Sequence, residues 1–270
     1  MLEKNTKKRA EPCFEKALSG QYTLDVNNIL REAWQYTLQS RMSINLGILF
    51  ILLLGTLASL ITSNLMGGIE VIMEDPKGMS LLNIVVTVVI WPFLAGVVMM
   101  GVHHAQHKKT RATMVFSFLQ RGSWVALCAL LTSILISFGI QLLILPGIFL
   151  AVVLSLTIPL VVDKKISPIQ AIKVSIMSLR FKFFQLFRLY LLLFIALIVL
   201  ATPIVLFAES SIAPLAIILF ILGMSFLAPL YYHVKGIVYR EVFVEKEQKD
   251  SVEISPSDLQ KSDNDDTFSA

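Results

Sequence analysis

The chain has 270 residues, of which 56% are hydrophobic and 16% are charged, and its formal net charge at pH 7 is +4. A mean hydropathy of +0.74, with charges gathered at the ends of long apolar runs, is typical of a membrane protein and not of a soluble domain. Cys13 falls in a polar arm and Cys128 inside an apolar run, so we expect no disulfide. The composition therefore predicts an all-α, polytopic integral membrane protein.

Residues 1–43 form a charged arm without a long apolar run, so we expect no cleavable signal peptide. Between Val26 and Leu38, apolar residues recur at helical spacing with polar residues between them. This pattern predicts an amphipathic helix that lies on the membrane surface before the first span. The loop that follows the first span carries two turn signals, Gly67-Gly68 and Asp75-Pro76.

Six spans are predicted, because a helix needs about 20 apolar residues to cross a bilayer. The uncharged run from Ser123 to Val162 is twice that length, and we predict two antiparallel helices that meet at Pro146-Gly147. Proline removes a backbone donor there, and glycine loosens the backbone. The other predicted spans are Ile44–Ser63, Leu81–Met100, about Leu186–Ala208 and about Ile212–His233, and the last helix is expected to continue beyond its span.

These spans divide the chain into a cytoplasmic arm (1–43), a six-helix transmembrane domain (44–240) and a disordered acidic tail (241–270). Every lysine and arginine except Lys77 then falls on one side of the membrane. The positive-inside rule predicts that this side, with both termini, is cytoplasmic. The basic side should attract anionic lipid headgroups, whereas no basic and aromatic cluster forms a platform for nucleic acid.

The segment before the fifth span combines helix-start signals with a basic, amphipathic pattern. Ser167 predicts an N-terminal cap, Pro168 a first helical residue and Gln170 a capping box. Cations edge an apolar stripe in this helix, so they can reach lipid phosphates while the stripe enters the interface. The candidate headgroup ligands are Lys173, Arg180 and Lys182, and the stripe consists of Ile169, Ile172, Ile176, Leu179 and Phe183.

Short apolar segments also precede the first span and, at Met114–Leu119, the third span. A cation and then a predicted hairpin of two spans follow each segment. This order suggests three parallel repeats related by an axis along the membrane normal, and independent coincidence is the alternative. We therefore predict interfacial amphipathic helices before the odd-numbered spans.

One block of residues carries a resemblance to a known family. It consists of Leu145-Pro146-Gly147-Ile148-Phe149-Leu150, then Pro159-Leu160-Val161-Val162-Asp163-Lys164, then Ser167, Ala171, Ser175 and Arg180. This block resembles the core signature of YciC-type proteins of the bacterial inner membrane. It is also similar to the membrane domains attached to some glycerophosphodiester phosphodiesterases.

The resemblance implies a six-helix protein of the bacterial cytoplasmic membrane, in a family whose molecular role is not established. It implies no catalytic residue and does not extend to a phosphodiesterase domain, so that activity is not carried over. Where the family has an aromatic residue, often tryptophan, near positions 181–183, this chain has phenylalanine. The motif positions are Pro146, Gly147, Pro159 and Asp163.

Three features could carry chemistry, and each has a structural alternative. His103, His104 and His107 are the best metal candidates, but no carboxylate or cysteine nearby completes a ligand set and cations adjoin them. Asp163 either pairs with a neighbouring cation or acts as a hinge or gating contact. A small-residue stripe on the third span, which recurs every four residues, either packs against another helix or lines a polar path. It consists of Ala129, Ser133, Ser137 and Gln141.

No predicted span carries Asp, Glu, Lys or Arg near its middle, where each would cost about 2.5–3.5 kcal/mol to insert. Coupled ion transport is therefore disfavoured, and no nucleotide-binding, serine-hydrolase or zinc-protease motif occurs. We expect a non-enzymatic protein, without cofactor or metal, that organises or senses lipids or envelope state and whose partners are membrane lipids. The alternative is an uncoupled carrier or channel for a lipid or small molecule, with spans kinked at Pro92, Pro159, Pro203 and Pro229. Association with copies of itself or with other proteins stays open.

Overall fold

The computed structural model describes residues 15–244, and within that range the chain forms helices and no β-strand. Six helices in this range are long and apolar enough to cross a membrane. They confirm the predicted all-α, polytopic membrane architecture. Residues 1–14, which include Cys13, and most of the predicted acidic tail lie outside the described residues.

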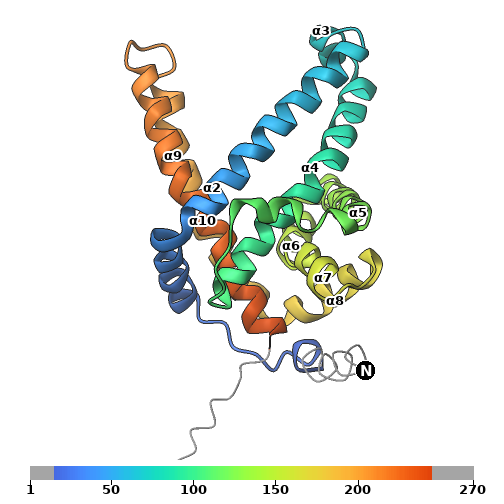
Figure 1. Cartoon of the computed structure of the whole chain (residues 1–270), viewed down its shortest axis with the longest axis vertical. Coiled ribbons are helices and arrows are strands. Elements are labelled where there is room, and N and C mark those ends of the chain that lie inside the picture. The colour runs from blue at the N-terminus through green and yellow to red at the C-terminus, as the bar shows by residue number, and fades with distance from the viewer. Residues whose placement is uncertain (1–14, 245–270) are drawn as a thin grey trace, which may run out of the picture.

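The first hairpin consists of α2 (Val26–Leu65) and α4 (Pro76–Ala105), which the short helix α3 (Ile69–Glu74) joins (Figure 1). Gly67-Gly68 before α3 has φ angles of +94° and +108°, a conformation that suits glycine. The Asp75 side chain then caps α4. The predicted turn signals are confirmed, and α3 adds a helix that the sequence did not predict.

α2 unites two segments that the sequence predicts as separate helices. Ser40 interrupts it with φ −132° and ψ 16°, so the helix kinks between the predicted surface segment and the predicted first span. In the segment before the kink, Val26, Ile29 and Ala33 are buried. This side of the segment therefore packs against the protein, and its position on a membrane surface stays a prediction.

The second hairpin turns back at a different residue from the one that the sequence predicts. α5 (Gly122–Leu142) is followed by Leu143 in an extended conformation, and α6 (Ile144–Val153) begins directly after it. Pro146-Gly147 lies inside the first turn of α6, so the prediction of a reversal at this pair is wrong by a few residues. Proline fits there because the first amides of a helix have no partner within the helix.

Gly147 serves close packing at this turn. A methyl group at Gly147 would come within 2.8 Å of Ile140 Cα, and one at Gly139 within 3.0 Å of Gly147 Cα. α5 and α6 therefore touch backbone to backbone near Leu143, which a larger residue at either glycine would prevent.

The returning half of this hairpin is broken in two. α6 ends at Val153, and α7 (Thr157–Asp163) begins after three residues in a turn. Pro159 lies in the first turn of α7 and has no amide proton to donate to Ser155, so an uninterrupted helix would lack that bond. The kink predicted at Pro159 is therefore a break between two helices.

The remaining elements are two short helices before α5, the helices that lead into the third hairpin, and the two helices of that hairpin. α8 begins with the predicted capping box, in which Ser167 and Gln170 bond each other's backbone amides. α10 continues without interruption past His233, as the pattern predicts. The elements are η1 (Ala112–Phe116), η2 (Leu119–Arg121), α8 (Pro168–Leu179), η3 (Arg180–Lys182), α9 (Phe183–Leu206) and α10 (Ala213–Phe243).

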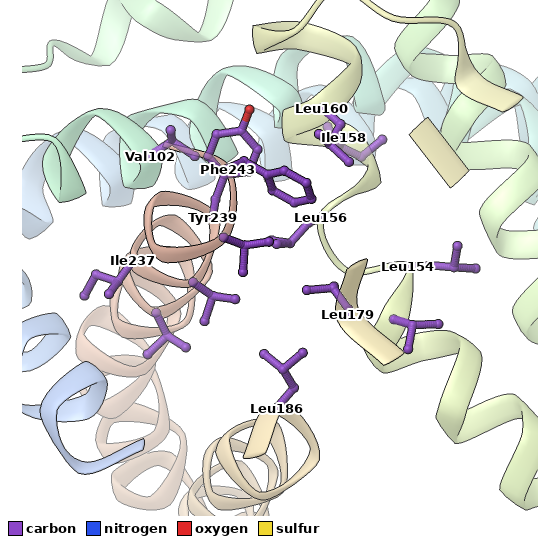
Figure 2. Close-up of a cluster of buried hydrophobic side chains, with 14 of the residues drawn as sticks. Val102, Leu154, Leu156, Ile158, Leu160, Leu179, Leu186, Ile237, Tyr239 and Phe243 are labelled. Carbon is purple, nitrogen blue, oxygen red and sulfur yellow. The ribbon is translucent and has the colours of Figure 1, made fainter. Parts of the chain in front are cut away.

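Burial is concentrated where α4, α7 and α10 end, a region that we call the basic end. Figure 2 shows apolar side chains from several helices converging there, among them Val102, Leu160, Leu179 and Tyr239. Away from the basic end, the α2–α4 and α9–α10 hairpins diverge (Figure 1). The core of this protein therefore lies at one end of its spans.

Candidate functional site

At the basic end, α4 and α10 cross in backbone contact. A methyl group at Gly236 of α10 would overlap the Gly101 carbonyl of α4, and one at Gly101 would overlap the Tyr232 carbonyl. α2 packs against both helices at this crossing. The close approach brings polar side chains from three helices within hydrogen-bond distance of one another.

A chain of hydrogen bonds runs through the crossing. The Thr37 hydroxyl lies 2.9 Å from His233 Nδ1, and His233 Nε2 lies 2.9 Å from His104 Nδ1. His104 Nε2 lies 2.7 Å from the Thr110 hydroxyl, which is 3.1 Å from the Ser43 hydroxyl. Thr37, His104 and His233 are buried. We call Thr37, His233, His104 and Thr110 the histidine chain.

The histidine chain has a definite direction when both imidazoles are neutral. Thr37 donates its hydroxyl proton to the Ala33 carbonyl at 2.8 Å, so it accepts from His233 Nδ1. His233 Nε2 then accepts from His104 Nδ1, and His104 Nε2 accepts from Thr110. This assignment satisfies every imidazole nitrogen of the chain, as burial requires.

An ion-pair cluster joins the same three helices. Arg240 on α10 donates to both carboxylate oxygens of Glu32 on α2, at 2.6 and 2.9 Å, and to Glu241 at 2.9 Å. It also donates to the Ala105 carbonyl at the end of α4, at 2.7 Å. Because the guanidinium is planar and carries five donors, it suits this arrangement better than a lysine would.

The loop after α4 holds a residue in a strained conformation. His107 has φ +57°, and the Lys108 amide bonds the His103 carbonyl, a helix end that usually has glycine at the left-handed position. The His107 side chain lies 3.1 Å from the Tyr36 hydroxyl. Its imidazole therefore makes a contact with α2 that glycine could not make.

A pocket of about 520 Å³ opens beside the histidine chain, between the α2 kink and the loop after α4. Its lining includes Lys108 and Lys109, both exposed, and His104 and Thr110 of the histidine chain. No carboxylate lines it among the described residues. We call this cavity the basic pocket, and its other polar lining residues are Tyr36, Gln39, Ser40, Ser43 and His107.

The predicted metal candidates do not converge on one point. His104 bonds His233, whereas His107 bonds Tyr36. The 2.9 Å between the His104 and His233 nitrogens is a hydrogen-bond distance, shorter than two nitrogen ligands of one tetrahedral zinc ion allow. In residues 15–244, no group of three His, Cys, Asp or Glu side chains could hold a metal ion.

The candidate headgroup ligands lie together on α8 and η3. Lys173 and Arg180 are exposed and Lys182 is half-buried, and none of them pairs with an acidic side chain within residues 15–244. The Arg180 guanidinium lies 4.8 Å from the centre of the Phe181 ring. The geometry leaves all three cations available to an external anion.

The apolar stripe of this helix divides between the protein and its surroundings. Leu179 is buried, Ile172 and Ile176 are half-buried against the core, and Ile169 is 61% exposed. The buried face of α8 is instead formed by small residues, of which Ser175 donates to the Val153 carbonyl. The prediction that the whole stripe faces the interface is therefore wrong, because part of it packs against the protein.

The chain before α2 covers the end of α8. The Tyr22 hydroxyl donates to the Ser178 carbonyl at 2.7 Å, and burial raises the pKa of Tyr22 above its ordinary value. Gly20, with φ +72°, lies against the Phe181 ring, where a methyl group would come within 2.8 Å. This contact accounts for Phe181, an aromatic residue in the basic segment that follows α8.

Asp163 makes the predicted pairing and a further contact. Its carboxylate lies 3.3 Å from Lys164 Nζ, which confirms a pairing role, and it accepts a 2.6 Å hydrogen bond from Tyr239 of α10. Among the other motif positions, Pro146, Gly147 and Pro159 shape the second hairpin. The motif block thus sets the path of α6 and α7 and fastens the end of α7 to α10.

The small-residue stripe on α5 does not pack within the chain over its length. Ala129 is buried, whereas Ser133, Ser137 and Gln141 are exposed. Within residues 15–244 the packing prediction therefore holds for Ala129 alone. The exposed part faces lipid or another molecule.

A second, apolar pocket of about 410 Å³ lies between α9 and α10. Leu193, Leu197 and Met224 line it, with Tyr190 and Tyr231 among its few polar residues. The Tyr190 hydroxyl is buried and makes no hydrogen bond of standard geometry with the described residues. This pocket has the lining that a hydrocarbon chain requires.

Comparison of the chain with protein-family models, with curated proteins and with solved structures finds no match. Similarity to known proteins therefore gives no function for the site, and its function is inferred from its geometry. Sequence reasoning missed the histidine chain, because His233 and Thr37 lie far from His104 along the sequence. The available signal was His233 itself, a polar residue near the end of an apolar span.

Proposed function

We propose that this protein is a non-enzymatic, multi-pass protein of the bacterial cytoplasmic membrane that binds anionic lipid headgroups at the cytoplasmic leaflet and so organises or senses lipids. Both described chain ends would lie on the cytoplasmic side, because the basic residues gather there. This placement agrees with the resemblance to YciC-type proteins.

The observation that carries the proposal is the outer surface of α8 and η3. Lys173 and Arg180 are exposed there and Lys182 is half-buried, all three without acidic partners in the described part of the chain, and Ile169 and the nearby Phe184 of α9 are exposed as well. Cations beside exposed apolar groups suit the headgroup region, where each basic residue contributes about 1 kcal/mol toward an anionic surface.

The test uses the full-length protein in lipid nanodiscs of neutral phosphatidylcholine or of phosphatidylcholine with phosphatidylglycerol. Mass spectrometry of the lipids retained after detergent extraction should show enrichment of phosphatidylglycerol. The triple variant Lys173→Gln, Arg180→Gln, Lys182→Gln should lose most of that enrichment. The charge-preserving triple variant Lys173→Arg, Arg180→Lys, Lys182→Arg should keep it. Equal enrichment of phosphatidylglycerol by both variants would contradict the proposal.

One observation favours a second candidate, an uncoupled lipid carrier. The apolar pocket between α9 and α10 could hold an acyl chain, with Tyr190 and Tyr231 toward the headgroup. A carrier would move fluorescent lipid between leaflets of a vesicle, and Met224→Trp should block that movement by filling the pocket. Lipid movement equal to that of empty vesicles would exclude this candidate.

A further inference from the structure

The basic pocket has the composition of an anion site. Lys108 and Lys109 supply positive charge, and hydroxyl or amide groups of Gln39, Ser43 and Thr110 supply donors. The nearby carboxylate of Glu32 is occupied by Arg240. An anion with several acceptor oxygens would therefore meet donors from α2 and from the loop after α4, in a pocket that no carboxylate of the described residues lines.

The size and position of the pocket limit the classes of ligand that it could bind. About 520 Å³ is in the range of small-molecule sites and exceeds what a halide needs. We propose that the basic pocket binds a phosphate ester, either the headgroup phosphate of a lipid or a soluble phosphate ester. The lipid source rests on the membrane placement in the proposed function, and the soluble source does not.

Occupation of the pocket would act on the histidine chain through Thr110. The Thr110 hydroxyl has one proton, which it gives to His104 Nε2 in the empty pocket. If Thr110 donates to a phosphate oxygen instead, His104 Nε2 faces the hydroxyl oxygen and needs a proton of its own. A proton from solvent at Nε2 supplies it, and the imidazolium still donates from Nδ1 to His233.

Reversal of the whole chain is the other way to satisfy these atoms. It would require Thr37 to donate to His233 Nδ1 and to give up its 2.8 Å bond to the Ala33 carbonyl. Proton uptake keeps every bond of the buried chain, so the ligand should bind together with about one proton.

Other titratable or charged groups surround the imidazole pair. The ring centres of Tyr36 on α2 and His233 are 6.0 Å apart, and His103 adjoins His104 on α4. Lys108 and Lys109 face the pocket, and Lys235 and Arg240 follow His233 along α10. These cations oppose a proton on His104 in the empty pocket, and a bound anion offsets them.

The experiment is calorimetric titration of the full-length protein in phosphatidylcholine nanodiscs. One arm adds diethyl phosphate, a phosphodiester without a titratable proton near neutral pH, and the other adds dihexanoyl phosphatidylglycerol. Each arm is run in two buffers of different ionisation enthalpy, which reports protons taken up. We expect uptake of about one proton per ligand.

Thr110→Val, which keeps the shape and removes the hydroxyl, and Lys109→Gln should each weaken binding about tenfold. Thr110→Val should also abolish proton uptake. Lys77→Gln, with the same charge change at an exposed position at the opposite end of α4, is the control and should leave both quantities unchanged. His233→Gln tests the chain at a distance from the pocket, because it should reduce proton uptake more than affinity.

The two arms distinguish the sources. Binding that depends on Thr110 in both arms means that the phosphate ester alone suffices, and such binding in the lipid arm alone assigns the pocket to headgroups. Binding that is equal in Thr110→Val, Lys109→Gln and Lys77→Gln would reflect surface charge and would overturn the proposal, as would no binding in either arm. The test of the proposed function with the α8 triple variant has an independent outcome, because that variant leaves the basic pocket intact.

Discussion

The basic end and the opposite end of this protein are built on different principles. At the basic end, Leu160 and Tyr239 are fully buried among side chains from several helices (Figure 2). Toward the opposite end, Val205, Leu206 and Ile218 are 77%, 71% and 61% exposed. A transmembrane helix satisfies its own backbone, so a hairpin can persist in lipid with little packing against its neighbours. The difference indicates that the basic end determines the fold, while the far halves depend on lipid.

The largest expected contrast comes from one truncation in each region. Leu160→Ala removes a fully buried side chain and should lower the free energy of unfolding by about 2–5 kcal/mol. Ile218→Ala, at a position 61% exposed, should change it by about 0.5 kcal/mol or less. Denaturant titration in detergent micelles measures both. Comparable losses would show that the far half is packed, for instance against a second copy.

The crossing of α4 and α10 should be the next most sensitive place. Gly236→Ala places a methyl group on the Gly101 carbonyl, and backbone cannot move aside as a side chain can. We expect a loss of about 1–3 kcal/mol or more, measured by the same titration. Gly78→Ala is the control, because its methyl group would find ordinary contact distances and α4 would gain helix propensity.

A tolerated Gly236→Ala would mean that the two helices can separate without cost. The histidine chain would then not depend on the crossing, and the proton uptake measured with a phosphate ester should survive the substitution. A destabilised Gly236→Ala that also loses proton uptake would support the crossing as the element that aligns His104 with His233.

The sequence predicted the spans well because their signal is local. Apolar runs of sufficient length, the cap at Ser167 and the turn signal at Asp75-Pro76 each require only neighbouring residues. The turn of the second hairpin was misplaced because proline is tolerated in the first turn of a helix, so Pro146 is compatible with either position. The role of Gly147 in the α5–α6 contact could not be seen without the partner helix.

The candidate site was predicted only in part, because it depends on long-range contacts. The basic residues of α8 could be identified from periodicity, whereas the division of its stripe depends on which helices cover it. His104 was noticed as a metal candidate, but its partner His233 lies on another helix, and periodicity gives no information about pairs between helices. The ion pair of Glu32 with Arg240 was missed for the same reason.

Loss of the Arg240 cluster should have an intermediate effect. Arg240→Met keeps much of the apolar stem but removes the guanidinium that donates to Glu32 and Glu241, and we expect a loss of about 1.5–3 kcal/mol. Arg240→Lys should recover only part of the lost free energy of unfolding, since lysine cannot bond both Glu32 oxygens and the Ala105 carbonyl in one plane. A double-mutant cycle with Glu32→Gln isolates the pair. A coupling energy near zero would show that α2 is held by its other contacts with α10, among them the Thr37–His233 hydrogen bond.

The smallest expected effect concerns His107, where the basic end carries local strain. A non-glycine residue in the left-handed conformation costs about 1 kcal/mol, and His107 offsets part of that cost through its contact with Tyr36. His107→Ala keeps the cost and loses the contact, whereas His107→Gly loses both. The glycine variant should therefore be more stable than the alanine variant by about 1 kcal/mol. Tyr36→Phe supplies the control: it should destabilise the wild-type chain more than it destabilises His107→Gly, because only the wild-type chain loses the imidazole contact, whereas the Tyr36–Glu32 contact is present in both. Equal stability of the alanine and glycine variants would mean that the loop relaxes on substitution. Its shape would then depend on the His107 imidazole instead of on the end of α4.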